Sequence, residues 1–273
     1  MNTKWLAAGM SLALLCACGS SEEESNNASN NASNNTTGEL HPAFAEFDED
    51  NTDIYIEDGA VVIETNGLPN HPSPYWGEGE DLYEEPTELM ASKMAGARIP
   101  GFDASATLRI PLTPTLADET TATALGSIGI AISGAAIFND QEGNGPLGGG
   151  VVTGLDFTGA HIGPSVYHYH LEPLYLSDDD SSLIGVLTDG FFIYGRKCNS
   201  TGSYPTDLDA SGGHTSVNQY STEPEYHYHV INEIFLDDLY ILFAGDLQGN
   251  VGSFDGVEAG GGMGGGMGGP PGG

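Results

Sequence analysis

The sequence predicts a mainly β fold: antiparallel sheets arranged as a sandwich or barrel-like single domain, with few short helices. Apolar and polar residues alternate with a period of two in several segments, as they do on half-buried strands. Two such segments, residues 53–57 and 60–64, flank Asp58 and Gly59, which together form a strong signal for a two-residue hairpin turn. Between residues 100 and 250 we find no long, capped pattern of helical period, and the best helix candidate is the short segment 86–97.

Further apolar segments complete the expected sheets. Residues 107–112 alternate as a half-buried strand, and Pro111 within them predicts a sheet edge. Residues 127–138 and 183–194 are apolar runs interrupted by glycine, and each is expected to form a bent central strand. Residues 239–244 predict one more strand.

The start of the chain predicts an exported lipoprotein. Lys4 is followed by a short apolar run, residues 5–15, which has the length of a signal peptide and is too short to span a bilayer. Residues 15–19 (LCACG) resemble the lipobox that the lipoprotein signal peptidase recognises. The resemblance implies that residues 1–17 are removed and that Cys18 carries acyl chains such as palmitate, which anchor the protein to a membrane. Because glycine rather than aspartate follows Cys18, we expect the outer membrane; an ordinary signal peptide cut elsewhere is the alternative.

Composition divides the rest of the chain. Residues 18–39 comprise the lipidated cysteine and a Ser/Asn/Glu-rich tether without core-forming side chains. Residues 40–255 are of a length that suits one domain. Residues 256–273 form a tail rich in Gly, Met and Pro, which is expected to be disordered.

The charge and the cysteines exclude several classes of function. The chain has 39 Asp and Glu against 6 Lys and Arg, so nucleic acid is excluded as a partner, and the membrane contact is expected through the lipid anchor alone. No phosphate loop or dinucleotide fingerprint indicates a nucleotide cofactor. Cys198 has no intramolecular partner once Cys18 is lipidated, so we expect a solitary exposed thiol and no disulfide.

An internal repeat carries the chemistry. Residues 155–161 (LDFTGAH) precede the tetrad 167–170 (YHYH), and residues 208–214 (LDASGGH) precede the tetrad 226–229 (YHYH). Six of the eight histidines therefore fall in one pattern that occurs twice, which indicates a specific role for it.

Strand geometry places the histidines together. Side chains alternate across a strand, so His168 and His170 share one face while Tyr169 points to the other. His161 is expected on a loop that returns to supply a third nitrogen. Three imidazoles suit zinc or copper, and the two repeats could build one site or two. The second copy offers the equivalent set: His214, His227 and His229.

Acidic and phenolic residues near the repeats are candidates for supporting roles. Asp156 and Asp209 are candidate ligands, or acceptors that fix an imidazole tautomer. Asp189 precedes a glycine in an apolar run, which predicts a tight turn that directs it inward. Tyr169 and Tyr228 could assist a reaction at the histidines. The alternative is a structural network of hydrogen-bonded histidines without a metal.

The two tetrads, with residues 189–195 (DGFFIYG) between them, resemble the YHYH-domain family of secreted bacterial proteins. The resemblance extends from residues 66–72 to about Phe243. It implies an exported protein but no settled activity. The family's usual cysteine at the position of Ser211 is absent here, which leaves Cys198 without the disulfide partner that the resemblance would otherwise imply.

Three functions are compatible with these features. The first is an anchored extracytoplasmic domain that binds copper or zinc through the histidine repeats. The second is a metal-dependent hydrolase or oxidase that uses the same histidines with an open coordination position. The third is a non-metal module for adhesion or glycan binding. His71 lies outside the repeat and is expected at the surface.

Overall fold

The computed structural model describes residues 38–94, 96–101, 103–143, 145–163 and 165–256. The predicted signal peptide, the lipidation site Cys18, nearly all of the tether and the tail 257–273 lie outside these residues. The described residues belong to one compact unit. None of its helices is long and apolar enough to cross a membrane. The unit is mainly β, with largely antiparallel sheets and no closed barrel among the described strands, which confirms the predicted fold class.

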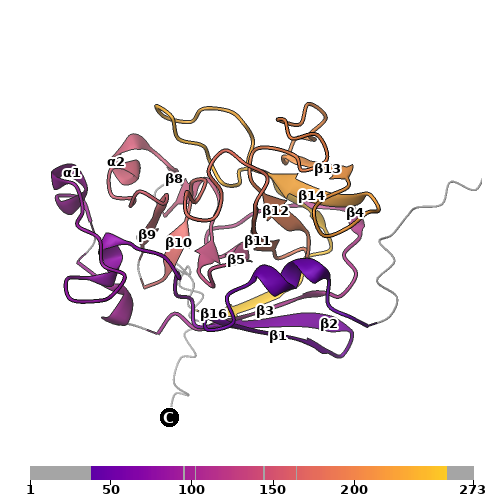
Figure 1. The fold of residues 1–273 in the computed structure, drawn as a ribbon, viewed down its shortest axis with the longest axis horizontal. Coiled ribbons are helices and arrows are strands. Elements are labelled where there is room, and N and C mark those ends of the chain that lie inside the picture. Colours follow the sequence, from indigo (N-terminus) through magenta and orange to yellow (C-terminus); the bar gives the residue numbers. More distant parts are fainter. Residues whose placement is uncertain (1–37, 95, 102, 144, 164, 257–273) are drawn as a thin grey trace, which may run out of the picture. The chain divides into compact units, whose positions relative to one another are not determined.

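A four-stranded antiparallel sheet has the order β1-β2-β3-β16 (Figure 1). Its strands are β1 (Thr52–Glu57), β2 (Ala60–Thr65), β3 (Ala106–Pro111) and β16 (Ser253–Gly256). The predicted hairpin is confirmed, since Asp58 and Gly59 have φ of 49° and 75°, as a type I′ turn requires. The edge predicted from Pro111 is wrong, because β3 pairs on both sides. The proline is tolerated because β16 pairs only as far as Arg109.

An eight-stranded sheet has the order β13-β14-β12-β11-β5-β6-β10-β9. In chain order its strands are β5 (Gly129–Ala131), β6 (Ala136–Ile137), β9 (Ala160–Ile162), β10 (Tyr167–Tyr169), β11 (Leu183–Leu187), β12 (Phe192–Tyr194), β13 (Gly213–Ser216) and β14 (Glu225–His229). The runs 127–138 and 183–194, predicted as single bent strands, are hairpins instead. Gly134 and Gly190, with φ of 101° and 89°, allow the chain to reverse.

This sheet consists of two copies of one four-stranded unit. In the first copy β5 pairs antiparallel with β6, β6 pairs parallel with β10, and β10 pairs antiparallel with β9. In the second copy β11, β12, β14 and β13 pair in the same three ways. The copies join where β5 runs antiparallel to β11. The duplication therefore begins upstream of the Leu-Asp motifs in which the sequence repeat is obvious.

The remaining elements are short. They are the strand pairs β4 (Leu116–Ala122) with β15 (Asp246–Gly249) and β7 (Gln141–Glu142) with β8 (Gly145–Pro146), the helices α1 (Glu88–Ala91) and α2 (Gly149–Val152), and the 3₁₀ helices η1 (Pro42–Glu46), η2 (Pro74–Trp76) and η3 (Ile99–Gly101). The helix expected at 86–97 is confined to α1, which Thr87 caps. The strand predicted at 239–244 is wrong, because Leu239 and Ile241 form only isolated bridges.

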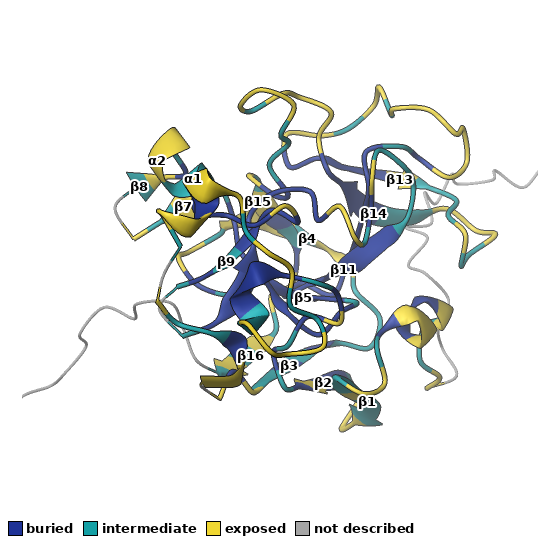
Figure 2. Cartoon of the chain, turned by 60° about the vertical axis from the view of Figure 1, so that its left-hand side comes forward, coloured by how far each residue is buried: buried dark blue, intermediate teal, exposed yellow. Residues whose placement is uncertain are grey.

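Apolar packing covers both faces of the large sheet, whose strand β11 is buried along its whole length (Figure 2). One core joins β2 and β3 of the small sheet to β5, β11 and β12; its members include Ile63, Leu108, Ile130, Val186 and Phe192. A second core contains tetrad tyrosines and side chains from the connecting segments, such as Tyr75, Ile99, Leu242 and Phe243. The small sheet therefore packs on one face of the large sheet, while connecting segments cover the tetrad tyrosines on the other face.

The contact between the two copies is close enough to exclude side chains. A Cβ on Gly129 would overlap the carbonyl oxygen of Val186, and a Cβ on Gly185 would overlap that of Ile130. Gly185→Ala should therefore force β5 and β11 apart and lower the free energy of unfolding by about 1–3 kcal/mol. Urea denaturation of the variant measures this loss. The matched control Gly150→Ala meets open space, and it should stay within about 0.5 kcal/mol of the native protein.

Candidate metal centres

The structure gathers the six repeat histidines into two separate clusters. In each cluster four side chains offer one ligand atom apiece, and these atoms all lie within 4.8 Å of one another. The first cluster comprises Glu142, His161, His168 and His170, and the second comprises Cys198, His214, His227 and His229. Each repeat therefore builds its own group of potential ligands.

Strand pairing assembles the histidines of the first cluster. His168 on β10 lies directly opposite His161 on β9, and directly opposed residues of antiparallel strands share a face. The expectation of a loop position for His161 is therefore wrong. His170 follows two residues after His168, so it points to the same face. In the second cluster His214 on β13 lies opposite His227 on β14 in the same way.

Backbone carbonyls fix the tautomers of the tetrad histidines. In the first cluster Nδ1 of His168 lies 2.9 Å from Val166 O, and Nδ1 of His170 lies 2.7 Å from Asn139 O. A carbonyl oxygen only accepts hydrogen bonds, so each Nδ1 carries a proton and each neutral ring presents a lone pair at Nε2. The second cluster has the equivalent contacts, from His227 Nδ1 to Glu225 O at 2.9 Å and from His229 Nδ1 to Gly195 O at 2.7 Å.

The Nε2 lone pairs converge on one another. In the first cluster Nε2 of His168 and Nε2 of His170 are 3.0 Å apart. In the second cluster Nε2 of His229 and Nε2 of His214 are 3.3 Å apart. When both rings of a pair are neutral and carry their proton on Nδ1, no donor lies between the two Nε2 atoms. Lone pairs that face each other at this distance repel unless a cation or an extra proton lies between them.

An extra proton is disfavoured by the surroundings. Burial, reinforced by the neighbouring imidazoles, lowers the pKa of His168 well below its ordinary value. The same two causes lower the pKa of His227 to about 4 and that of His229 to about 3. At neutral pH these rings are therefore neutral, which is the state in which imidazole binds metals.

Glu142 supplies the carboxylate of the first cluster. Its Oε1 lies 2.8 Å from Nε2 of His161 and 2.9 Å from Nε2 of His170. Within the described residues, however, neither Glu142 Oε1 nor His161 Nε2 has a partner in hydrogen-bonding geometry. Burial opposes ionisation of Glu142, but contact with the protonated forms of His161 and His170 outweighs it and holds the pKa of this carboxyl well below its usual range. An ionised oxygen and three nitrogens therefore point toward a common centre.

Cys198 occupies the corresponding place in the second cluster. It is a free cysteine, 1% exposed, so the expectation of an exposed thiol is wrong. Its Sγ lies 3.7 Å from Nε2 of His214, whose Nδ1 lies 2.9 Å from Asp207 Oδ1. A Cys-His-Asp series of this kind can activate a thiol nucleophile. The burial of Cys198 and the convergence of His227 and His229 on it fit metal ligation better.

Asp156 and Asp209 accept hydrogen bonds from tyrosine hydroxyls rather than from imidazoles. Tyr167 donates to Asp156 at 2.6 Å, and Tyr226 donates to Asp209 at 2.7 Å. The turn that directs Asp189 inward is confirmed, because Asp189 is fully buried. Its Oδ2 accepts a 2.6 Å bond from the hydroxyl of Tyr228.

Tyr169 also points away from the histidine cluster. Its hydroxyl lies 2.9 Å from Ser133 Oγ and 2.7 Å from Nε2 of His71. His71 is 4% exposed, so the expected surface position is wrong. Tyr169 and Tyr228 both lie on the opposite face of their strand from the histidines.

Sequence reasoning missed Glu142, Cys198 and Asp207. The first two could have been found by aligning the apolar runs 127–138 and 183–194, because this alignment places Glu142 opposite Cys198. Asp207 has no such signal, because no Asp or Glu precedes His161 at the same spacing.

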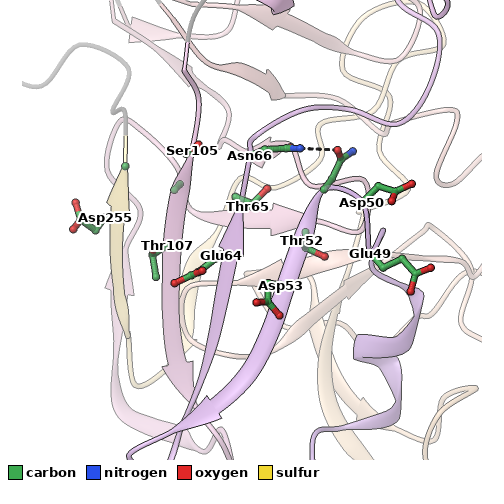
Figure 3. A pocket seen from close by; sticks show the side chains of 13 residues that line it. Glu49, Asp50, Thr52, Asp53, Glu64, Thr65, Asn66, Ser105, Thr107 and Asp255 are labelled. Atoms are coloured by element: carbon green, nitrogen blue, oxygen red, sulfur yellow. Dashed lines mark hydrogen bonds between the residues drawn. The ribbon is translucent and has the colours of Figure 1, made fainter.

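A different hollow lies on the small sheet. It has a volume of about 600 Å³ and is bordered by a cross-strand row of Asp53, Glu64, Thr107 and Asp255 (Figure 3). The three carboxylates of this row are exposed to solvent. The amide of Asn66 bonds Asn51 at 2.8 Å, so it is not free for a ligand. This hollow therefore has the character of a solvated acidic surface.

Fold and site together define a β domain with two buried, histidine-rich groups that could each hold a metal ion. A family model described as YHYH protein matches residues 107–206, which supports assignment of the chain to the YHYH family, as the tetrads predicted. The matched segment contains the first tetrad and the Asp189 turn, and it ends before His214 and the second tetrad. No curated protein and no solved structure matches the chain.

The face of each tetrad strand that carries the tyrosines, here called the tyrosine face, provides a test of the structure that needs no metal. Tyr228→Phe removes a donor from the buried Asp189 and an acceptor from the backbone N–H of Gln248. We expect the free energy of unfolding to fall by about 1–3 kcal/mol, because buried polar groups lose a partner. The control Tyr204→Phe removes the hydroxyl of an exposed tyrosine, which bonds Asp179, and it should change stability by less than about 0.5 kcal/mol. Equal effects of the two substitutions in urea denaturation would contradict this account.

Proposed function

We propose that this domain binds two transition-metal ions, zinc or copper, one in each cluster. The observation that carries the proposal concerns the tetrad histidines. Backbone carbonyls fix the tautomer of each of these rings, and the Nε2 atoms that remain point toward the centre of their cluster. Tetrahedral zinc with bonds of about 2.0–2.3 Å holds its ligand atoms about 3.3–3.8 Å apart. In the second cluster Nε2 of His214 lies 3.3 Å from Nε2 of His229 and 3.7 Å from Sγ of Cys198, which fits that spacing. Contacts of 2.8–3.0 Å in the first cluster require only a small expansion.

A metal accounts for the clusters better than a structural network does. A network of neutral histidines needs alternating donors and acceptors. Here the Nδ1 donors are used by carbonyl oxygens, so the Nε2 atoms of His168 and His170 have no proton between them when both rings are neutral. A cation between them removes this repulsion and uses every lone pair. The Nδ1 bonds also orient the rings, as supporting acceptors do in known metal sites.

The arrangement supports holding a metal rather than turnover. Four protein donors complete a tetrahedral shell, whereas catalytic zinc keeps one position for water. An apolar hollow of about 240 Å³ lies beside the second cluster, and His229 is the one cluster member among its lining residues. Only one of the four ligands therefore borders this hollow. Binding or handling of the metal is accordingly favoured over hydrolysis or oxidation.

We also propose that the protein is exported and anchored through acyl chains on Cys18, with the domain in the periplasm or at the cell surface. The lipobox-like residues 15–19 and the preceding apolar run support this. A tether rich in Ser and Asn would separate the membrane from the domain. The net charge of −33 argues against direct adhesion of the domain to anionic lipid.

Metal content tests the first proposal. The full-length chain, purified without a polyhistidine tag and offered zinc or copper, should hold two metal ions per chain by mass spectrometry. A His168→Ala/His170→Ala variant should lose one ion, and His227→Ala/His229→Ala should lose the other. The variant with all four changes should hold none, because three-histidine sites do not survive the loss of two imidazoles.

A matched control keeps the result interpretable. His41→Ala removes a histidine that contacts Glu225 and lies outside both clusters, so it should retain two ions. Circular dichroism checks that each variant is folded. A folded native chain that remains metal-free after both metals are offered would refute the proposal.

Membrane partitioning tests the anchor. The native chain expressed in a bacterial host should be found in the membrane fraction and incorporate labelled palmitate. Cys18→Ala should abolish both, because the acylated thiol is removed. Cys16→Ala keeps that thiol and serves as the control, since we expect it to remain anchored. Label in the Cys18→Ala chain would contradict the assignment.

A further inference from the structure

We infer that the two clusters have diverged from one ancestral site into a thiophilic and a non-thiophilic metal centre, and that the single exchange of Glu142 for Cys198 determines the difference. This inference rests on the proposed metal binding and extends it to the class of metal that each centre selects. The second cluster would take a soft ion such as copper(I) or cadmium. The first would take a harder divalent ion such as zinc or copper(II).

Glu142 and Cys198 are structurally equivalent. The hairpin β5–β6 corresponds to β11–β12 in the duplicated sheet. After β6, the carbonyl of Asn139 bonds Nδ1 of His170. After β12, the carbonyl of Gly195 bonds Nδ1 of His229 in the same way. Glu142 stands three residues after Asn139, and Cys198 stands three residues after Gly195. The chain therefore delivers its fourth ligand at one position in both copies.

The other ligands are the same in both centres. Each has two tetrad histidines and one histidine on the antiparallel neighbour strand, with the same Nδ1 contacts to backbone oxygen on the tetrad. A carboxylate and a thiolate each contribute one negative charge, so the exchange leaves the charge of the ligand set unchanged. What changes is the softness of the fourth ligand. Thiolates favour soft ions, whereas carboxylates favour hard ones.

Solvent access differs in the same direction. The Glu142 side chain is 25% exposed and that of His161 is 14% exposed. Cys198 is 1% exposed, and the side chain of His214 is 6% exposed. A thiolate centre closed to solvent protects the sulfur from oxidation. The more open carboxylate centre is accessible for exchange of its ion.

Cobalt(II) and cadmium(II) distinguish the centres spectroscopically. The full-length chain loaded with two equivalents of cobalt(II) should show visible d–d absorption from both ions and a sulfur-to-cobalt charge-transfer band from one. One equivalent of cadmium(II) should abolish the charge-transfer band first and leave the d–d absorption of the first centre. Loss of the band in His227→Ala/His229→Ala, but not in His168→Ala/His170→Ala, would assign it to the second cluster.

Exchanging the ligands is the decisive step. In Glu142→Cys/Cys198→Glu the band should persist but depend on His168 and His170, and cadmium should displace cobalt from the first centre first. If the double variant does not fold, Glu142→Cys alone should show a band of twice the native amplitude. Two bound cobalt ions without a charge-transfer band, or with equal cadmium displacement in the native chain, would overturn the inference and leave metal binding intact. No bound cobalt at all would overturn both.

Discussion

Parallel pairing within each half of the large sheet is the constraint on which the rest of the site depends. β10 lies beside β6 and β14 lies beside β12, so the chain that leaves each hairpin passes the end of a tetrad. The carbonyl of Asn139 or Gly195 then meets Nδ1 of the last tetrad histidine. Because that bond is to the backbone, it fixes the imidazole tautomer whatever side chain the residue carries. The Nε2 lone pairs, and hence the ligand geometry, follow from sheet topology.

The tetrad uses the alternation of a strand to separate two tasks. Its histidines converge on the ligand centre, while its tyrosines enter the core on the other face and donate to polar partners there. Tyr167 and Tyr228 are both fully buried, so each hydroxyl needs the partner that it finds. Large rings with satisfied hydroxyls make the strand rigid. Rigidity on the tyrosine face holds the histidines at ligand distance even before an ion arrives.

The sequence predicted the β class, the first hairpin and the shared face of the two histidines in each tetrad, because each depends on local alternation or on turn residues. It left open whether the two repeats build one site or two. It failed at 127–138, where Gly134 reverses the chain instead of bending it. It also predicted a contact between Asp156 and the histidines or their metal, since strand periodicity does not reveal that the hydroxyl of Tyr167 bonds this carboxylate. The fourth ligands were missed because they lie outside the tetrads, on segments that only parallel pairing brings close. Non-local pairing was thus the missing information.

Divergence after duplication has affected side chains on both faces and preserved the backbone contacts between them. On the tyrosine face Ser133 partners Tyr169, while Asp189, at the equivalent turn position, partners Tyr228. On the histidine face Glu142 stands where Cys198 stands in the other copy. The contacts of Nδ1 with backbone oxygen, by contrast, are the same in both halves. A fold that fixes its histidines through the backbone is free to vary the remaining ligand. Two copies of one scaffold can therefore present different chemistry without a change in geometry.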